Sequence, residues 1–268
     1  MTNSVSEQRH RLACMEVWGG NRTIETTVEL PGLSGWLYSL PSDGDVGGDV
    51  YYLSVCDQDL LSRIALADVS GHGSAISSRA EVLRSLMHKH INNWDQSDFM
   101  QELNRSFRIG MPAETYASMV LIGYYRKTGQ LLLTNAGHLP PLWYRAVERQ
   151  WEWLERDSPC VETAIEGLPL GLIAGTDYWQ TAYRLAEGDL LVLYTDAITE
   201  AIDGGGSELG RQRLREIAQS IPVDLPEATG TVLRARVRAY ARGAPAGDDE
   251  TLLVLQAQAA AGLGGAAA

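Results

Sequence analysis

The chain has 268 residues, of which 45% are hydrophobic and 21% are charged. This length and composition fit a globular protein with a sizeable core, and they exclude a collagen-like repeat, wholesale disorder and a disulfide scaffold. The formal net charge of −12 and the lack of a basic stripe in the sequence disfavour binding to nucleic acid or to an anionic membrane, whereas an acidic chain can supply carboxylates to cations.

The predicted secondary structure alternates strands with two pairs of helices. Short apolar runs bounded by turn residues predict strands at 50–56, 62–68, 116–125, 130–135, 141–145, 189–195 and 251–255. Hairpin-length turns, such as residues 127–129, indicate that much of the sheet is antiparallel. Helices are predicted at 73–92, 97–108, 207–219 and 226–241. This order predicts an α+β fold in which helices cover sheets.

We expect one domain over residues 13–257, because the internal Gly/Pro-rich stretches are only loop-sized. A disordered N-terminus is expected at 1–12 and a flexible Ala/Gly-rich tail at 258–268. Three scattered cysteines without a CxxC spacing fit a reducing compartment. The N-terminus has no apolar signal segment, and no apolar run is long enough to span a bilayer, so we expect a cytoplasmic protein with no membrane association.

Four aspartates lie beside predicted strands. Asp49 opens a strand after two glycines, Asp68 and Asp196 each end an apolar strand, and Asp248 comes just before the last one. Carboxylates gathered at one rim repel each other, and a hard divalent cation relieves this repulsion. Oxygen ligands select Mg²⁺ or Mn²⁺ over zinc. Two such ions about 3.5–4 Å apart can acidify a bridging water and bind a phosphate.

Each aspartate also has an ordinary structural interpretation when it is taken alone. Asp49 could belong to a hairpin turn, Asp196 could cap a helix, and Asp248 and Asp249 could form a solvated turn. The segment 68–73 is more specific, because its glycines lead into a helix and indicate a close approach of the backbone to a ligand. The presence of all four acids beside strands favours the metal-site interpretation.

Seven motifs occur along the chain in the order found in one family of enzymes. They are Gly47-Gly48-Asp49, Asp68-Val69-Ser70-Gly71-His72-Gly73, Asn135-Ala136-Gly137-His138, Pro169-Leu170-Gly171, Glu187-Gly188-Asp189, Tyr194-Thr195-Asp196 and Asp248-Asp249-x-Thr251. In this set the chain resembles bacterial PP2C-type (PPM) serine/threonine phosphatases, within the group named for the sporulation phosphatase SpoIIE and the stress-response phosphatase RsbU. The resemblance covers about residues 30–256. The set is specific, although no single motif is.

The resemblance implies a four-layer α/β/β/α sandwich of the PP2C type, with mostly antiparallel sheets and a metal site at one rim. It implies hydrolysis of phosphoserine or phosphothreonine on a protein by a metal-bridging hydroxide, with two Mn²⁺ or Mg²⁺ ions as cofactors. The residues that the family pattern places at the site are the catalytic metal ligands Asp49, Asp68, Asp196 and Asp248, the Val69 carbonyl, and Gly71, His72 and Asp249 as candidate supporting residues. We expect His138 to be a turn residue.

Relatives in this group typically act on a phosphorylated STAS-domain anti-anti-sigma factor, so the resemblance implies a regulatory phosphoprotein of that kind as the substrate.

The sequence departs from the family pattern at Tyr52, where many relatives have an aspartate, and at Ala197, where a glycine is usual. Few residues precede the first predicted strand, so we expect no sensor domain, and regulation would come from a partner in trans or be absent. Such a partner could act through the predicted helix pair at 73–108, which begins close to Asp68.

Two other functions stay open at this stage. One is a pseudo-phosphatase, a binding module that keeps the fold and sequesters phosphoprotein, and Tyr52 and Ala197 leave room for it. The other is a two-metal phosphoesterase that acts on a small molecule. Retention of all four aspartates favours the active protein phosphatase, and metal-dependent turnover of a phosphoprotein would separate the three.

Overall fold

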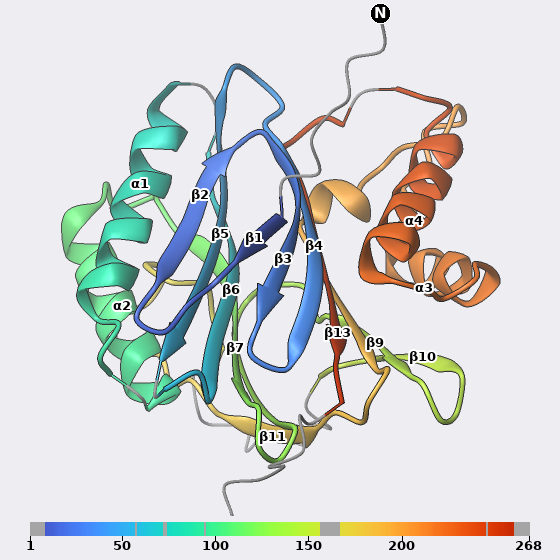
Figure 1. Cartoon of the computed structure of the whole chain (residues 1–268). Helices are drawn as coiled ribbons and strands as arrows, with labels where there is room; N and C mark the ends of the chain where they lie inside the picture. The colour runs from blue at the N-terminus through green and yellow to red at the C-terminus, as the bar shows by residue number, and fades with distance from the viewer. Residues whose placement is uncertain are drawn as a thin grey trace, which may run out of the picture.

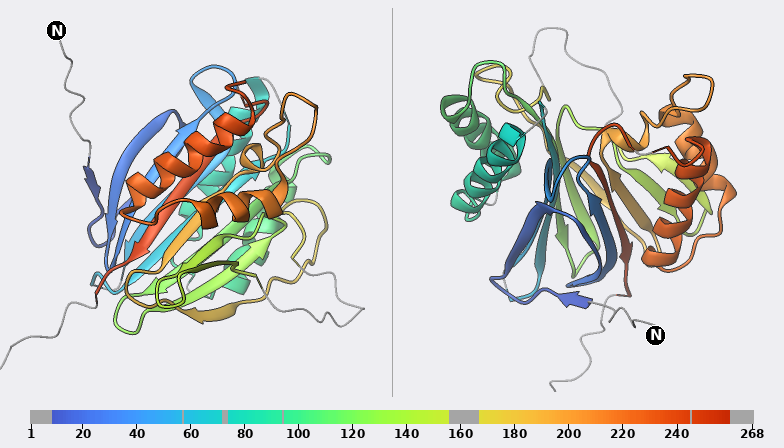
Figure 2. Two further views of the ribbon diagram at one scale, coloured as in Figure 1. Left: turned by 90° about the vertical axis from the view of Figure 1, so that its right-hand side faces the viewer. Right: turned by 90° about the horizontal axis from the view of Figure 1, so that it is seen from above.

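The computed structural model describes residues 9–56, 58–71, 74–93, 95–155, 167–244 and 246–259. Two β-sheets pack face to face, and each carries a pair of helices on its outer face, so the chain forms four layers (Figures 1 and 2). This arrangement confirms the α/β/β/α sandwich expected from the sequence. Among the strand pairings of the described residues, only that of β1 with β3 is parallel.

One sheet has seven strands in the order β1-β3-β4-β13-β12-β9-β10. In that order the strands are β1 (Arg9–Arg11), β3 (Ile24–Leu30), β4 (Leu33–Leu40), β13 (Glu250–Ala257), β12 (Leu190–Tyr194), β9 (Leu142–Arg145) and β10 (Gln150–Trp153). The last strand of the chain pairs with both β4 and β12 at the centre of the sheet. Because Leu252 pairs with Tyr194, the start of β13 lies beside the end of β12.

The other sheet has six strands in the order β11-β8-β7-β6-β5-β2. In that order the strands are β11 (Thr181–Arg184), β8 (Gln130–Ala136), β7 (Ala117–Tyr125), β6 (Leu61–Val69), β5 (Val46–Cys56) and β2 (Val17–Arg22). The predicted turn between β7 and β8 is present, and Gly129 takes a φ of 68° there, which glycine adopts at little steric cost. Strands β5 to β8 therefore form an antiparallel meander.

Two helices cover each sheet. Helices α1 (Ser74–Lys89) and α2 (Gln96–Gly110) pack on the six-stranded sheet, and α3 (Gly210–Ser220) and α4 (Pro226–Tyr240) pack on the other (Figure 1). Helix α2 begins after Asp95, whose side chain accepts hydrogen bonds from two backbone N–H groups of the first turn. Helix α4 begins with Pro226, where a missing N–H leaves no hydrogen bond unmade. In the part of the chain that the structure describes, no helix is long and apolar enough to cross a bilayer.

Alternation along the strands divides the apolar side chains among three clusters. In β5, Tyr51 and Leu53 point into the core between the two sheets, whereas Val50 and Tyr52 lie beneath α1 and α2. The third cluster lies beneath α3 and α4 and includes Trp36. Each fully buried aliphatic side chain contributes about 1.5–3 kcal/mol to folding, so both sheets are held from two sides. The candidate site lies at one end of the core between the two sheets.

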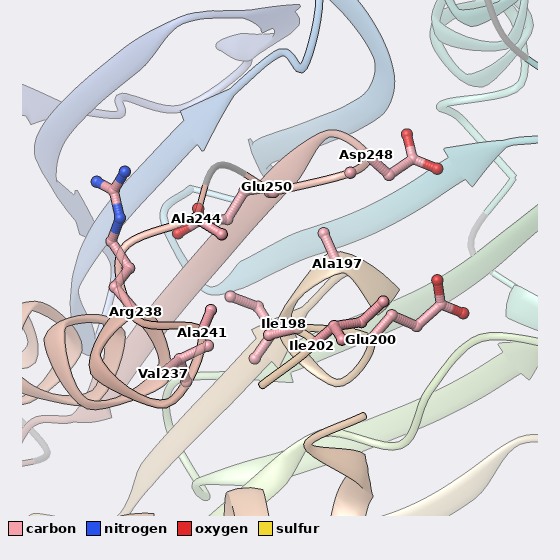
Figure 3. Close-up of a pocket in the computed structure, with 13 residues that line it drawn as sticks. Ala197, Ile198, Glu200, Ile202, Val237, Arg238, Ala241, Ala244, Asp248 and Glu250 are labelled. Atoms are coloured by element: carbon pink, nitrogen blue, oxygen red, sulfur yellow. The ribbon is translucent and has the colours of Figure 1, made fainter. Parts of the chain in front are cut away.

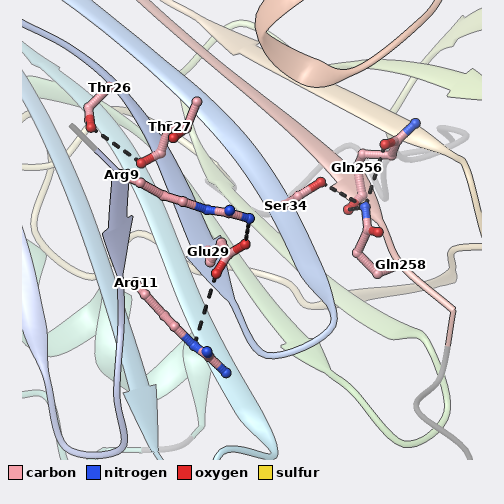
Figure 4. Close-up of polar contacts among 8 residues, drawn as sticks. All are labelled: Arg9, Arg11, Thr26, Thr27, Glu29, Ser34, Gln256 and Gln258. Atoms are coloured by element: carbon pink, nitrogen blue, oxygen red, sulfur yellow. Dashed lines mark hydrogen bonds and ion pairs between the residues drawn. The ribbon is translucent and has the colours of Figure 1, made fainter. Parts of the chain in front are cut away.

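The N-terminal part of the chain differs from expectation. Residues 9–12 were expected to be disordered, but 9–11 form β1, and Leu12 packs in the inter-sheet core. Arg9 and Arg11 both pair with Glu29 on the neighbouring strand β3 (Figure 4). Strand pairing and the burial of one leucine thus extend the ordered chain beyond the predicted domain start at 13. Residues 1–8 lie outside the described residues.

The end of the chain also continues past the predicted boundary at 257. The backbone N–H of Gln258 donates to the carbonyl of Gly32 at 2.9 Å, and its side-chain amide donates to Ser34 Oγ at 2.7 Å (Figure 4). Residues 260–268, which complete the predicted tail, lie outside the described residues. Gln258 therefore extends the interactions of β13 at the end of the sandwich where β3 turns into β4.

Candidate functional site

Asp49 and Asp68 face each other across neighbouring strands, because they are paired in the antiparallel register of β5 and β6. Side chains alternate along a strand, and Tyr51 and Leu66, which are on the same side as the two aspartates, belong to the inter-sheet core. Both carboxylates therefore lie on the inner face of the six-stranded sheet. Asp49 is only 3% exposed, so a buried carboxyl group lies at the end of the inter-sheet core. We call this end of the sandwich, where Asp49 and Asp68 lie, the rim.

Buried hydroxyl groups from the opposite sheet hold Asp49 in place. Thr195, which follows β12, donates from Oγ1 to Asp49 Oδ2 at 2.9 Å. Thr195 Oγ1 also accepts a hydrogen bond from the backbone N–H of Thr251 at 3.0 Å. Thr251 Oγ1 in turn lies 2.9 Å from Ser39 Oγ on β4. This hydrogen-bonded chain links the two sheets directly beneath the rim and fixes the position of one predicted ligand.

Asp196 and Asp248 come from the seven-stranded sheet. Asp196 begins a short 3₁₀ helix, η1 (Asp196–Ile198), directly after β12, and Asp248 lies two residues before β13. The Asp196 carbonyl accepts the N–H of Thr199 at 2.8 Å, so this aspartate is the first residue of a helical turn, whereas the N-cap position suggested by its ordinary interpretation belongs to Thr195. Ala197 is not among the described residues with positive φ, so alanine replaces the usual glycine without backbone strain.

Asp249 ties together the hairpin that presents Asp49. Its Oδ1 accepts the backbone N–H of Ser42 at 2.7 Å, and its Oδ2 accepts that of Gly48 at 2.5 Å. A Cβ atom at Gly47 would lie 2.2 Å from Asp249 Oδ2, so only glycine fits at that position. The carboxylate of Asp249 is therefore occupied by backbone donors of the hairpin, and its charge also raises the pKa of Asp49 and Asp68.

The segment that leaves β6 passes close to the same hairpin. A Cβ atom at Gly48 would lie 3.0 Å from the carbonyl oxygen of Val69, which places that carbonyl beside the Asp49 hairpin. Gly71 has a φ of 130°, a conformation that side-chain-bearing residues rarely adopt. Nη1 of Arg79, on α1, would be 3.1 Å from a Cβ at Gly71, so a cation missed by the sequence analysis lies over this loop. His72 lies outside the described residues.

The carboxyl groups of the rim raise one another's pKa. Burial, followed by the charges of Asp196 and Asp248, raises the pKa of Asp68 to about 7. Burial and the charge of Asp68 raise the pKa of Asp49 well above its usual range. Burial and the charge of Asp248 raise the pKa of Asp196. The four predicted ligands thus act on one another across both sheets, and none of the main charges acting on these three belongs to a lysine or arginine of the described chain.

Glu200 is a further acid at this rim that the sequence analysis did not assign to the site. Burial and the charge of Asp196 raise its pKa, and Glu200 in turn raises that of Asp68. In Figure 3 the carboxylates of Glu200 and Asp248 extend toward the same side. The spacing of four residues from Asp196 was the signal available in the sequence, because such residues lie on one face of a helical turn.

The donor set fits a hard cation in its chemistry. Among the described residues, the side chains of the predicted ligands at the rim are all carboxylates, and oxygen ligands of this kind suit Mg²⁺ and Mn²⁺. The uncompensated negative charge is what such an ion would neutralise. Within the described ranges, however, no three Asp, Glu, His or Cys side chains are grouped as a complete ligand set. Binding would therefore draw the carboxylates of the two sheets closer together.

His138 lies beneath the rim and does more than shape a turn. Asn135 Oδ1 accepts its backbone N–H at 2.8 Å, which is the expected turn contact. Its ring Nδ1 lies 2.7 Å from Oγ of Ser118, and Ser118 pairs with Asp68 in the β6–β7 register. Burial lowers the pKa of His138 to about 4, so the ring is neutral at pH 7. His138 therefore supports the strand next to Asp68 as an uncharged hydrogen-bonding group.

Tyr52, the other departure from the family pattern, does not face the rim. Its ring is 1% exposed and packs in the core beneath α1 and α2, on the opposite side of β5 from Asp49. Burial raises its pKa to about 12, so the phenol is neutral. The tyrosine is therefore a core residue, and its presence removes no acidic group from the carboxylate rim.

A pocket of about 420 Å³ adjoins the carboxylates on the side of α4 (Figure 3). Its walls come from η1 and the residues after it, from the end of α4, and from the loop that leads into β13. The residues that line it are Ala197, Ile198, Glu200, Ala201, Ile202, Val237, Arg238, Ala241, Ala244, Ala246, Gly247, Asp248 and Glu250. Asp248 and Glu200 belong to both the pocket and the rim, so the two are continuous.

A family model and a curated protein both match this chain. Residues 60–258 match the family model described as Stage II sporulation protein E (SpoIIE). The chain is 28% identical over 156 residues to the phosphoserine phosphatase RsbU of Bacillus subtilis (strain 168). That alignment covers 58% of this chain and 43% of RsbU, so the chain matches less than half the length of its curated relative.

Solved structures with the same fold extend over most of the chain. The SiaA-PP2C domain of Pseudomonas aeruginosa aligns with a TM-score of 0.70 and 19% identity, over 83% of this chain and 85% of that one. The RsbU and RsbW domains of Rv1364c from Mycobacterium tuberculosis align with a TM-score of 0.69 and 23% identity, over 86% and 63%. The catalytic domain of the serine threonine protein phosphatase PstP, solved with 2 manganese ions, aligns with a TM-score of 0.56 and 15% identity, over 84% of this chain and 97% of that one. At these identities the likeness concerns the fold.

Proposed function

The chain belongs to the SpoIIE family, and we propose that it is a metal-dependent serine/threonine protein phosphatase of the PP2C type. The observation that carries the proposal is the meeting of acids from both sheets at one rim. Asp49 pairs with Asp68, and the charges of Asp196 and Asp248 act on Asp68 from the other sheet. RsbU, a relative over part of the chain, is named a phosphoserine phosphatase, which supports this class of reaction.

We assign the metal ligands to Asp49, Asp68, Asp196 and Asp248, with the Val69 carbonyl beside them. Two Mn²⁺ or Mg²⁺ ions held there would neutralise phosphoryl oxygens and lower the pKa of bound water. The residues of the chain itself position these ligands: Thr195 holds Asp49 through its hydroxyl, and Asp249 holds the hairpin that carries it.

Arg79 is the candidate for binding the phosphoryl oxygens, because its guanidinium lies over the loop that follows Asp68. A guanidinium suits this task, since it can donate two hydrogen bonds to one phosphate. Glu200 completes an acidic border that favours cations over free anions. Phosphate would therefore bind here only together with the metal ions.

The substrate that we propose is a phosphoserine or phosphothreonine on a regulatory protein of the STAS-domain type found with this family. An activating partner in trans would dock on α1 and α2, because α1 begins only a few residues after Asp68. The contrasting function is a pseudo-phosphatase that binds phosphoprotein without turnover.

The test is phosphate release from a phosphoserine peptide as Mn²⁺ is titrated. The wild-type protein is compared with Asp196→Asn and with Asp45→Asn, a matched change at an exposed aspartate outside the rim. We expect saturable hydrolysis in the wild type and in Asp45→Asn, and its loss in Asp196→Asn. Peptide binding without hydrolysis at saturating Mn²⁺, with or without added partner, would support the pseudo-phosphatase instead.

A further inference from the structure

We infer that the apolar pocket beside the carboxylate rim binds an aliphatic side chain of the substrate polypeptide, close in sequence to its phosphorylated residue. The inference rests on the proposed function, and it adds a determinant of substrate choice. The pocket has a volume of about 420 Å³, which is within the range of roughly 300–1,000 Å³ for sites that enclose an organic group.

The lining of the pocket is mainly aliphatic. Ile198 and Val237 are buried and form part of its wall, whereas Ile202 is 53% exposed although it is a large apolar residue. Between them the chain presents small side chains, including Ala241 and Ala244, and these leave the space open (Figure 3). An aliphatic side chain entering from outside would cover Ile202 and replace water on apolar surface.

Two of the four charged residues that line the pocket, Glu250 and Arg238, have their charged groups paired or turned away from its aliphatic wall. Glu250 accepts a hydrogen bond from Arg234 at 2.6 Å, so its charge is paired within the chain. In Figure 3 the guanidinium of Arg238 extends away from Ile198 and Ile202. The apolar part of the pocket therefore offers a charged or strongly polar ligand no partner of its own.

The pocket is continuous with the carboxylate rim, and this position favours a side chain of the substrate polypeptide as its occupant. Asp248, which we assign as a metal ligand, and Glu200 both line the pocket, and their carboxylates extend toward the same side of it (Figure 3). A polypeptide whose phosphate is held at the rim can extend over the mouth of the adjoining pocket, because each residue of an extended chain advances only about 3.3 Å. A side chain within a few positions of the phosphorylated residue can therefore reach the pocket, and no second ligand is required.

The probes are phosphoserine peptides on an alanine background, in which a single leucine is moved through four positions on each side of the phosphoserine. A non-hydrolysable phosphonate version of each peptide is used to measure binding to the Mn²⁺-loaded protein by fluorescence anisotropy. We expect leucine at one position, or at two neighbouring ones, to tighten binding by about tenfold, as burial of an aliphatic side chain should. At the other positions leucine should have little effect.

Two variants at the end of α4 locate the effect. Ala241→Phe, at the C-cap residue of α4, fills the pocket, whereas Ala239→Phe adds the same ring at an exposed position in the last turn of the helix that does not line the pocket. Ala241→Phe should abolish the leucine preference and leave both binding of the all-alanine peptide and hydrolysis of p-nitrophenyl phosphate unchanged. Ala239→Phe should behave as the wild type.

Equal binding of all peptides by the wild type, absence of peptide binding at millimolar concentration, or a preference that survives Ala241→Phe would overturn the inference. Failure of the proposed function has a different signature, because it removes hydrolysis of the matching phosphoserine peptides while the binding preference for leucine persists. The binding and turnover measurements thus judge the two claims separately.

Discussion

At one end of the sandwich, beside the turn from β3 to β4, acidic and basic side chains lie on the surface as pairs, and Glu29 faces both Arg9 and Arg11 (Figure 4). At the opposite end, acids meet acids: Asp49 and Asp68 are paired in register and feel the charges of acids from the other sheet. The first arrangement neutralises itself within the chain. In the second arrangement, none of the main charges acting on the rim acids comes from a lysine or arginine of the described chain. This uncompensated negative charge is the physical basis for assigning a metal site there.

The largest expected effect comes from removing one acid from each end of the sandwich and comparing the phosphatase activities of the two variants. Asp68→Asn should lower phosphatase activity by about 100- to 1,000-fold, because it deletes the acid that faces ligands of both sheets. Glu29→Gln should leave activity unchanged. Steady-state assays with Mn²⁺ and a phosphoserine peptide measure both. Full activity in Asp68→Asn would mean that the rim is not the catalytic site.

The hydroxyl chain beneath the rim provides a second, smaller test. Thr195→Val keeps the shape of the side chain but removes the donor to Asp49 and the acceptor for Thr251. We expect Mn²⁺ affinity or activity to fall by about 10- to 100-fold and the free energy of unfolding to fall by about 1–3 kcal/mol. Thr195→Ser is the control, since it retains the hydroxyl. If Val and Ser variants behave alike, the hydroxyl does not position Asp49.

The pH dependence of stability sharpens the contrast in charge. Folding raises the pKa of Asp68 to about 7 and raises that of Asp49, so between about pH 4 and pH 7 the native state holds protons that the unfolded chain releases. This contribution is present at low pH and is lost as pH rises through 7. In the presence of a chelator we expect the Tm to fall from pH 5 to pH 8, and to fall less in Asp68→Asn.

Added Mn²⁺ should reverse that loss of stability in the wild type, with an effect that grows with pH because the ion competes with protons for the carboxylates. Thermal unfolding followed by circular dichroism at several pH values measures both trends. A melting temperature that rises steadily from pH 5 to pH 8 without metal would argue against crowded, raised-pKa acids at the rim.

The smallest expected effect belongs to the paired end. Arg9 is well exposed, and exposed ion pairs contribute about 0–1 kcal/mol. Glu29→Gln should therefore change the free energy of unfolding by less than about 1 kcal/mol, and its pH profile should match that of the wild type. Chemical denaturation with urea measures the difference. A loss of several kcal/mol would show that β1 depends on these ion pairs for its place in the sheet.

Sequence reasoning reached the acids of the rim because each of them stands beside an apolar strand, a pattern that is local in the chain. It did not reach Thr195 as the anchor of Asp49, because that contact depends on how one sheet lies over the other. It also overlooked Glu200, whose helical spacing from Asp196 was visible but carried no motif. Strands β2 and β3 went unpredicted because β2 contains two glycines and β3 interrupts its apolar residues with threonine and glutamate.

The central claim is that acids from both sheets form one cation site. Isothermal titration calorimetry with Mn²⁺, on the wild type, Asp68→Asn and the exposed-site control Asp45→Asn, tests it without reference to any substrate. The account predicts binding of two ions in the wild type and in Asp45→Asn, and loss of at least one in Asp68→Asn. Equal Mn²⁺ binding by all three proteins, or no binding by the wild type, would contradict it.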